Sequence, residues 1–277
     1  MTFSRDIADY PEGIVLPIDK PFRWTSADVI RKVKYAAIKH FGKKNLKVGH
    51  AGTLDPLASG VLLVCIGAAC KRAQELQDHE KEYLATLRFG ATTPSYDLEK
   101  DADRFFPYEH ITEEKVRAVL PSFLGEQEQV APLFSAKSVD GVRAYELARK
   151  LYRSGRLSEL DSAALENLHR SRIVISEMEL LSFRPAGSPA LSPVEESVAG
   201  TPSGRINLAD TSHLGLPEAT IRIVCSKGTY IRALARDMGE ALGSGAHLST
   251  LIRTRTGSYS LSGAISLSEA LSSLASV

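Results

Sequence analysis

Cysteine is scarce in this sequence, and it contains no long hydrophobic run. The three cysteines are an odd number and lack the spacing of metal ligands, which indicates a reducing compartment. The longest apolar run, 61–70, is far too short for a bilayer, which requires about 20 residues. The first residues carry an acid early and no apolar segment of the kind found in secretion signals. We therefore expect a cytoplasmic protein with no membrane partner.

An excess of one charge sign and the common cofactor motifs are also absent. The 277 residues include 34 Lys or Arg and 33 Asp or Glu, so the net charge of +1 excludes no class of partner. No phosphate-binding loop, dinucleotide-binding glycine motif, zinc-protease motif or serine-hydrolase elbow occurs. The seven histidines are scattered, and none pairs with another histidine or a cysteine at metal-ligand spacing. We therefore expect neither a metal nor a cofactor.

A basic segment lies near the start of the chain. Residues 20–47 hold nine Lys or Arg and one acid, Asp28. Thr25 and Asp28 resemble a helix capping arrangement, apolar residues recur at helical spacing over 29–41, and Gly42 supplies a C-terminal stop. The basic face of this predicted helix is either an ordinary solvated surface or a surface that contacts phosphates. The residues alone favour neither interpretation.

Asp55 stands in the glycine-rich segment 49–60. Over residues 29–74 it is the only acid, against nine Lys or Arg. A positive charge brought close by the fold would hold such a carboxylate ionised. Pro56 pushes the backbone of Asp55 out of the helical region, and the flanking glycines permit close approach of a ligand. The alternative is a turn aspartate that satisfies its own backbone, and spacing alone slightly favours it.

The remaining patterns indicate a mixed α/β fold. Apolar runs and alternation predict strands over 61–67, 81–89, 172–175 and 219–225, and helical spacing predicts helices over 112–120, over 143–151 and after a capping Thr229. Residues 182–217 are rich in Pro, Gly, Ser, Ala and Glu, which favours a surface insertion or mobile linker. Strands and helices alternate at uneven intervals, which does not fit a regular βαβ wind.

Several segments form an ordered set of short motifs. The longest is GHAGTLDPLASG over 49–60, and the others are IDKP at 18–21, KEY at 81–83, FSAK at 134–137 with Gly141 and YELAR at 145–149, CSKGTYIR at 225–232, and GAHL at 245–248 with Leu251 and Arg253. Taken in chain order, these strings resemble the motifs of the TruB-type tRNA pseudouridine synthases, and 49–60 resembles the catalytic motif of that family. Together the motifs span roughly 13–257. Five matching strings besides 49–60, all in the right order, are not plausibly a coincidence.

The resemblance implies the pseudouridine synthase fold, which is mixed α+β with a central, largely antiparallel sheet flanked by helices. It also implies isomerisation of uridine to pseudouridine at position 55, in the T-loop of tRNA. In this reaction the uracil is detached from C1′ of the ribose, turned, and rejoined through C5. By match to the motif Asp55 is the catalytic carboxylate, and its number coincides with the tRNA position by accident. The sequence does not decide whether it attacks C1′, adds to C6 or works through a glycal, but each route needs an ionised carboxylate.

Arg232 and Tyr83 are the other catalytic residues that the resemblance implies. Arg232 corresponds to the family's ion-pair partner of the aspartate. Tyr83 matches the tyrosine that stacks on the target uracil and takes the C5 proton late in the reaction. Without the resemblance, Arg232 would be interpreted as an exposed helix arginine and Tyr83 as a strand tyrosine with its ring in the core.

Four further residues match positions that bind the substrate. Tyr230 matches a second tyrosine of the pocket, and Leu251 an apolar contact with the base. His50 matches the residue that occupies the stack left by the flipped nucleotide, since the base must leave its stack before any side chain reaches it. Lys20 belongs to a matching motif, and we expect it to support the active-site loop rather than to take part in the chemistry.

The predicted architecture is one catalytic domain over 1–277, with the insertion at 182–217 and a short C-terminal tail at 258–277. Only 20 residues follow Gly257, too few for the small RNA-binding PUA domain in which family members often end, so we expect no complete C-terminal PUA domain. The implied partner is tRNA, bound by its T-arm, and the basic segment 20–47 then contacts RNA phosphates. No protein partner is implied, and we expect a monomer.

Two other function classes compete with this interpretation. A non-catalytic RNA-binding or RNA-folding module that kept the shape and lost the reaction would be expected to have replaced the aspartate, and Asp55 is present. A hydrolase that cleaves nucleosides would need an activated water and would release free base.

Overall fold

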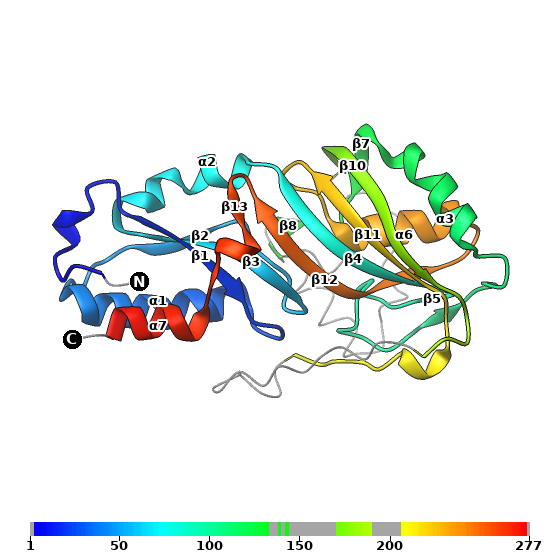
Figure 1. Ribbon diagram of the computed structural model, residues 1–277, viewed down its shortest axis with the longest axis horizontal. Coiled ribbons are helices and arrows are strands. Elements are labelled where there is room, and N and C mark those ends of the chain that lie inside the picture. The colour runs from blue at the N-terminus through cyan, green and yellow to red at the C-terminus, as the bar shows by residue number, and fades with distance from the viewer. Residues whose placement is uncertain (1–2, 133–137, 140–141, 144–169, 190–205, 276–277) are drawn as a thin grey trace. The chain divides into compact units, whose positions relative to one another are not determined.

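The computed structural model describes residues 3–132, 138–139, 142–143, 170–189 and 206–275 (Figure 1). The chain divides into two compact units. The first unit contains described residues 3–84, 206 and 250–275, and the second contains 85–189 and 207–249 with the gaps just named. Two long strands, β4 (Lys81–Phe89) and β12 (Ala246–Thr256), contribute residues to both units. The single catalytic domain over 1–277 stays a prediction.

The first unit is built on a sheet with the strand order β14-β1-β3-β12, in which β2 also pairs with β3 and β13 with β12. Its other strands are β1 (Ile14–Lys20), β2 (Val48–Ala51), β3 (Ala58–Ile66), β13 (Tyr259–Ser260) and β14 (Ile265–Ser266). Its helices are α1 (Ser26–Phe41), α2 (Ala73–Asp78) and α7 (Leu267–Ala275), with short 3-10 turns η1 (Ile7–Asp9), η2 (Gly67–Arg72) and η6 (Leu261–Gly263). The β1–β14 and β3–β12 pairs are parallel, and β1–β3, β2–β3 and β12–β13 are antiparallel.

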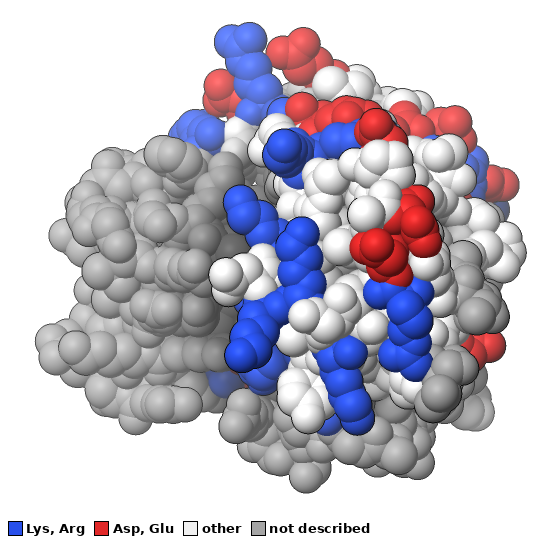
Figure 2. Space-filling view, turned by 90° about the vertical axis from the view of Figure 1, so that its left-hand side faces the viewer, with Lys and Arg blue, Asp and Glu red and all other residues white. Residues whose placement is uncertain are grey.

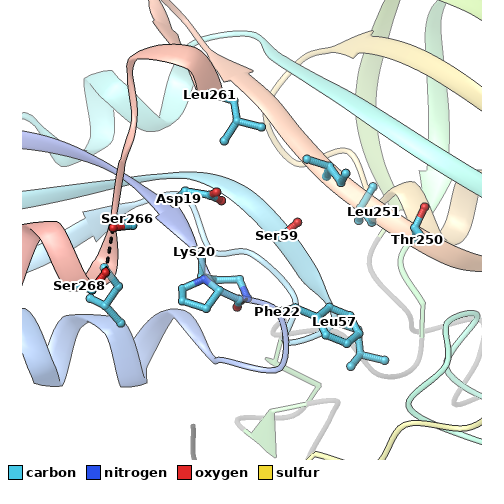
Figure 3. Close-up of a pocket in the computed structure, with 13 residues that line it drawn as sticks. Asp19, Lys20, Phe22, Leu57, Ser59, Thr250, Leu251, Leu261, Ser266 and Ser268 are labelled. Carbon is cyan, nitrogen blue, oxygen red and sulfur yellow. Dashed lines mark hydrogen bonds between the residues drawn. The ribbon is translucent and has the colours of Figure 1, made fainter. Parts of the chain in front are cut away.

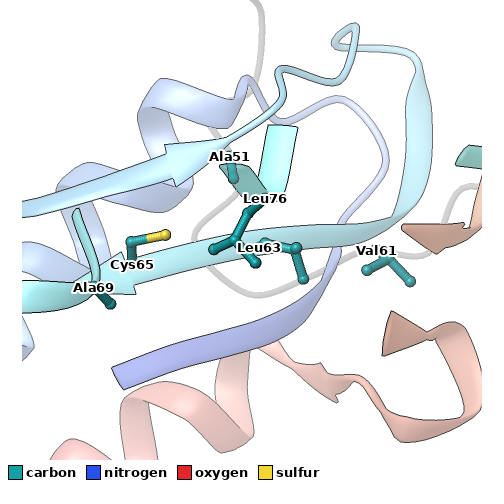
Figure 4. Close-up of a cluster of buried hydrophobic side chains, with 6 residues drawn as sticks. All are labelled: Ala51, Val61, Leu63, Cys65, Ala69 and Leu76. Carbon is teal, nitrogen blue, oxygen red and sulfur yellow. The ribbon is translucent and has the colours of Figure 1, made fainter. Parts of the chain in front are cut away.

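The continuous apolar run of β3 predicts a strand that is buried on both faces. The structure shows this burial. One face forms a buried cluster with neighbouring elements (Figure 4), made of Ala51, Val61, Leu63, Cys65, Ala69 and Leu76. On the other face, Leu62 and Val64 pair across with Ile18 and Leu16 of β1, and all four are buried. Helices α1 and α7 lie side by side in the same unit (Figure 1), where Nδ1 of His40 lies 2.9 Å from the carbonyl oxygen of Leu274.

Helix α1 begins and ends as its sequence predicts. The Thr25 side chain accepts from the Asp28 backbone N–H, and the Asp28 side chain accepts from the Thr25 backbone N–H, which completes a capping box. Gly42 follows the last turn with a φ of +62°, a left-handed conformation that favours glycine. Val29, Val33 and other apolar residues face the core, so the basic side chains of the helix lie outside.

The second unit contains the strand order β12-β4-β11-β10-β7. Its other strands are β7 (Gly125–Val130), β10 (Arg170–Arg184) and β11 (Glu218–Cys225), with the short pairs β5 (Ala91–Thr92) with β6 (Arg104–Phe105) and β8 (Ser138–Val139) with β9 (Val142–Arg143). Its helices are α3 (Glu113–Val119) and α6 (Ile231–Ala241), with turns η3 (Leu120–Phe123) and η5 (Ser212–Leu214). The β10–β11 and β7–β10 pairs are antiparallel. The predicted mixed α+β fold with a largely antiparallel sheet is confirmed.

Several element predictions need amendment. The strand expected over 172–175 is the start of β10, which continues to Arg184 through two register shifts. Thr229 does not cap α6, because its hydroxyl donates to the carbonyl oxygen of Ser226 at 3.0 Å and Tyr230 is the N-cap residue. The helix expected over 143–151 lies outside the described residues apart from Arg143 in β9, and so does 190–205 of the predicted insertion. Among the helices that are described, none is both long and apolar enough to cross a membrane.

Candidate active site

The loop that carries Asp55 joins β2 to β3. The backbone N–H of Ala58 donates to the carbonyl oxygen of Asp55 at 3.1 Å, which closes a turn at the start of β3. Leu54 and Leu57 are buried on either side, whereas Asp55 is half-buried. Gly52 has a φ of +92°, a conformation that side chains other than glycine rarely adopt. The loop thus anchors its leucines in the unit and keeps its carboxylate partly open to a ligand.

The start of α1 holds the loop just before Asp55. Ser26, the first residue of the helix, is buried, and its hydroxyl donates to the carbonyl oxygen of Leu54 at 3.2 Å. The same hydroxyl oxygen accepts the backbone N–H of Leu54 at 3.0 Å. Both polar backbone groups of Leu54 are therefore satisfied by one side chain, which couples the loop to the helix.

Arg253 of β12 fastens the two stems of the loop to each other. Its side chain is only 1% exposed. Nε donates to the carbonyl oxygen of Val61 at 2.7 Å, while Nη1 and Nη2 donate to the carbonyl oxygens of Thr53 and Gly52 at 3.4 and 3.1 Å. One of these carbonyls follows Asp55 and two precede it. A planar guanidinium with donors in fixed directions is suited to bridging such groups.

Lys20, the last residue of β1, holds the loop directly beside Asp55. Its ammonium group is buried and donates to the carbonyl oxygens of Trp24, Pro21 and Pro56 at 2.6, 2.9 and 3.2 Å. Burial lowers the pKa of Lys20 to about 7, and the negative charge of Asp55 opposes part of that shift. The bond to Pro56 supports the expectation that Lys20 stabilises this loop, and its role stays a prediction.

His50 lies on β2, just before the loop. Its Nδ1 atom is buried and has no hydrogen-bond partner among the described residues. Burial and the positive charge of Arg253 lower the pKa of His50, which favours the neutral form of its ring. A buried ring nitrogen without a partner is a polar atom that a bound ligand or water would satisfy.

A pocket of about 460 Å³ lies in the first unit (Figure 3). Leu251 of β12 and Leu57 lie on one side of it, and Lys20 and Asp19 at the end of β1 lie on the other. The other nine lining residues are five apolar ones and four that carry hydroxyl groups, and Asp55 does not line the pocket. Leu251 pairs with Ala58 in the parallel β3–β12 ladder, so the same register that positions Leu251 positions the end of the Asp55 loop. A pocket of this size that combines apolar side chains with polar groups is suited to bind a ligand.

Tyr83 lies on β4 and is 8% exposed. The residues before it fix this part of the strand. Oε1 of Glu82 accepts from the hydroxyl of Thr254 at 2.7 Å, and Nζ of Lys81 donates to carbonyl oxygens at the end of α2. The backbone that carries Tyr83 is therefore attached to both β12 and α2.

Arg232 and Tyr230 belong to the second unit, at the start of α6. Arg232 is 4% exposed, its Nη1 donates to the carbonyl oxygen of Ser95 at 3.1 Å, and its Nε lies 3.8 Å from the carboxylate of Asp97. The backbone N–H of Tyr230 donates to Oε1 of Gln129 at 2.8 Å, and Nε2 of Gln129 donates to the Tyr230 carbonyl at 3.1 Å. Gln129 thus binds both backbone polar groups of Tyr230, the N-cap residue of α6.

The first unit brings Lys20 and His50 to the Asp55 loop and holds Tyr83 and Leu251 on its own strands, while Tyr230 and Arg232 are placed in the second unit. The joint action of these residues stays a prediction. No group of three or more His, Cys, Asp or Glu in the described part of the chain is arranged to hold a metal.

Arg253 and Asp97 are buried charged residues of this site to which the sequence assigned no role. Arg253 shares the buried alternation of β12 with Leu251, and an arginine at such a position signals a buried group with partners. Asp97 lies in the segment between β5 and β6, where no periodicity marks it.

Comparisons with known proteins agree with the motifs. Residues 38–186 match the family model described as TruB family pseudouridylate synthase (N terminal domain), and residues 232–276 match the model described as tRNA pseudouridylate synthase B C-terminal domain. A protein of Phocaeicola vulgatus named tRNA pseudouridine synthase B is 48% identical over 94% of this chain and 92% of its own length. The protein of that name from Bacteroides thetaiotaomicron is 51% identical over 91% of this chain and 89% of its own length.

A solved structure shares the fold. The crystal structure of a Cbf5-Nop10-Gar1 complex contains a chain that is 24% identical, with a TM-score of 0.60 over 96% of this chain. This chain spans 56% of that one, about half of its length, so the likeness concerns the fold alone. The family model covering more than half of the residues, together with relatives near 50% identity along almost the whole length, places the chain in a family: it belongs to the TruB family of pseudouridylate synthases.

Proposed function

We propose that this chain converts uridine to pseudouridine at position 55, in the T-loop of tRNA. Uridine isomerisation is the reaction of the family to which the chain belongs, and its bacterial relatives carry the name tRNA pseudouridine synthase B. The observation that carries the proposal is the half-buried Asp55, on a loop whose two stems are tied to one buried arginine. In the motif that 49–60 resembles, this aspartate is the catalytic residue.

The reaction rearranges bonds and leaves the composition of the nucleoside unchanged. The bond between N1 and C1′ breaks, the uracil turns, and a bond between C5 and C1′ forms. The proton on C5 then leaves, and N1 gains one. Nothing is oxidised or reduced, so the balance requires no electron carrier. The Asp55 carboxylate starts the reaction as a nucleophile toward C1′ or C6, or as a base on the glycal route.

Tyr83 and Arg232 are the residues we assign to the chemistry beside Asp55. Tyr83 stacks on the uracil and accepts the C5 proton, and the strand that carries it is fixed through Glu82 and Thr254. Arg232 provides the positive charge that balances the carboxylate in the RNA complex. Its position is set within the second unit by Ser95 and Asp97.

The other predicted residues serve substrate binding. A base in a folded loop must leave its stack at a cost of about a few kcal/mol, which contacts to the flipped base and to the vacated stack offset. We assign the base contacts to Leu251 and Tyr230 and the vacated stack to His50, whose buried Nδ1 has no partner within the described chain. Lys20 holds the loop through the Pro56 carbonyl.

The substitution Asp55→Asn tests the assignment. Asn has nearly the same shape but no negative charge, so we expect turnover to fall by at least about 10³-fold while tRNA affinity stays close to that of the parent. Turnover is measured as tritium released from tRNA labelled at C5 of uridine, and the site is located by pseudouridine mapping.

The same assay separates the competing functions. A synthase releases tritium and leaves no free base, a nucleoside hydrolase releases free uracil, and an RNA-binding module does neither. Persistent turnover in the Asp55→Asn protein would refute the role of Asp55, and tritium release mapped to another uridine would refute the T-loop position.

A cytoplasmic location and a monomeric state complete the proposal. Cys65, Cys70 and Cys225 form no disulfide in the structure, which supports a reducing compartment. Size-exclusion chromatography with light scattering tests the oligomeric state directly.

A further inference from the structure

Helix α1 and the loop after it expose a row of basic side chains that the active-site geometry does not use. We call this surface the α1 basic face, and its members are Arg31, Lys32, Lys34, Lys39, Lys43, Lys44 and Lys47, all exposed. The one acid in the segment, Asp28, is 9% exposed and bound to Thr25 and Arg31. The charged side chains that this segment exposes are therefore almost all positive.

The lysines of the α1 basic face lack partners within the described chain. None of the six makes an ion pair or side-chain hydrogen bond with a described residue. Exposed arginines elsewhere do pair with acids, as in Arg72–Glu75 at 3.0 Å, Arg117–Glu113 at 2.8 Å and Arg172–Glu126 at 3.7 Å. Like charges gathered on one surface repel one another, so an anion that neutralises this face lowers its free energy.

An exposed aromatic ring lies among these basic side chains. Tyr35 is 75% exposed, and it lies one turn after Arg31 and one turn before Lys39 on the same helix. Figure 2 looks onto the side that is at the left of Figure 1, where α1 and α7 lie, and Lys and Arg side chains gather near the middle of this view. Exposed rings among cationic side chains are typical of surfaces that bind RNA, where the ring stacks and the cations contact phosphates.

We propose that the α1 basic face binds the sugar–phosphate backbone of tRNA and that Tyr35 stacks on the bound RNA. The identity of the RNA rests on the proposed function, whereas the surface itself follows from charge and exposure. Ser26 at the start of α1 holds both backbone groups of Leu54, the residue before Asp55. RNA held along α1 is thus bound by the element that also fixes the catalytic loop.

The test removes four charges from the face and compares them with four removed elsewhere. The α1 variant carries Lys32→Gln, Lys34→Gln, Lys39→Gln and Lys43→Gln, and the matched control carries Lys115→Gln, Arg117→Gln, Arg170→Gln and Arg172→Gln, all at exposed positions. Both lower the net charge equally, and Gln keeps helix propensity. We expect the α1 variant to bind tRNA at least about tenfold more weakly near 0.1 M salt, with a slope of log Kd against log salt shallower by about 3. The control should bind like the parent.

Kinetics and the tyrosine add independent readouts. With tRNA as substrate, the loss in the α1 variant should fall mainly on KM, because the face acts on RNA binding. Tyr35→Ala should weaken tRNA binding by about fivefold or more, and Tyr35→Phe should bind like the parent, since stacking requires the ring and not the hydroxyl.

Two outcomes overturn the inference. One is an α1 variant that binds tRNA with the affinity and salt slope of the parent, and the other is a control variant that loses as much affinity as the α1 variant. Failure of the proposed function looks different, because the parent protein would then bind tRNA and form no pseudouridine whatever happens to the α1 variant.

Discussion

Arg253 sets the geometry of the Asp55 loop through one guanidinium group. Lysine at this position keeps the charge but lacks the planar set of donors, so it cannot reach the carbonyls of Val61 and Gly52 together. We expect Arg253→Lys to lower kcat by at least about tenfold with little change in KM, because a displacement of about 1 Å at a reacting group can cost about 10²-fold. Single-turnover tritium release at saturating tRNA measures the effect.

A matched control lies two residues further along β12. Arg255 is about one-third exposed and pairs with Glu80 at 3.0 Å, so Arg255→Lys exchanges one surface ion pair for another and should leave turnover unchanged. Equal turnover in the Arg253→Lys and Arg255→Lys proteins would show that the guanidinium does not position the loop. Partial recovery of an Arg253→Ala protein in millimolar guanidinium salt would support positioning over a general loss of folding.

Some site residues could be predicted from the sequence and others could not. Asp55 and Lys20 belong to sequence motifs that can be recognised. In the structure, the ammonium group of Lys20 donates to the Pro56 carbonyl oxygen in the Asp55 loop. Arg253 donates hydrogen bonds to backbone carbonyl oxygens of residues far away in the sequence. Every residue has a backbone carbonyl, so the sequence does not show which ones Arg253 binds. The contact between Arg232 and Asp97 likewise joins segments far apart in sequence, in a region without apolar periodicity.

The close approach of β3 and β12, which are paired in parallel, depends on a glycine. Gly60 has a φ of +99°, and a Cβ placed there would lie 2.2 Å from the carbonyl oxygen of Arg253. Gly42 after α1 also has a positive φ, +62°, but a Cβ there meets nothing within 4 Å. Gly42→Ala should therefore cost about 1 kcal/mol from the left-handed backbone alone, whereas Gly60→Ala should cost at least about 3 kcal/mol. Urea unfolding of both proteins measures the difference, and equal costs would contradict the backbone collision.

Elements with strong periodicity were predictable, and those shaped by tertiary contacts were not. Strand β4 has the predicted bounds, and α1 has its predicted cap and stop, because both carry local signals. The sequence pattern missed the second half of β10 because Glu177 and Glu179 interrupt it with exposed polar side chains. These glutamates pair with Arg222 of β11 and do not face the core. Tyr230 is the N-cap in place of Thr229, whose hydroxyl donates to the carbonyl oxygen of Ser226 instead.

At the scale of the whole molecule, net charge conceals the distribution that matters for binding. The chain has a formal charge of +1. Several acids of the second unit pair with arginines, while the lysines of the α1 basic face pair with no described residue. A chain near neutrality can therefore still present one strongly positive surface, which the sum over the sequence does not reveal.

A buried polar network also links the stability of the molecule to pH. Arg88 and Glu218 form an ion pair in which both side chains are at most 3% exposed, and Nη1 of Arg88 donates to the hydroxyl of Thr211. That hydroxyl oxygen lies 3.1 Å from Nε2 of His247, whose Nδ1 lies 2.9 Å from the carbonyl oxygen of Ala91. Burial lowers the pKa of His247 to about 4, the Ala91 carbonyl opposes the shift, and the charge of Arg88 adds to it.

The unfolded chain, with an ordinary histidine pKa near 6.5, binds this proton more readily than the folded chain between pH 6.5 and 4. The contribution of neutral His247 is therefore fully present above pH 6.5 and is lost as pH falls toward 4, by roughly 3 kcal/mol in total. His247→Asn does not titrate, so we expect it to be less stable than the parent at pH 7 and to approach the parent as pH falls. Urea midpoints at several pH values from 7 to 4.5 test this, and parallel curves for the two proteins would show that His247 is not the group responsible.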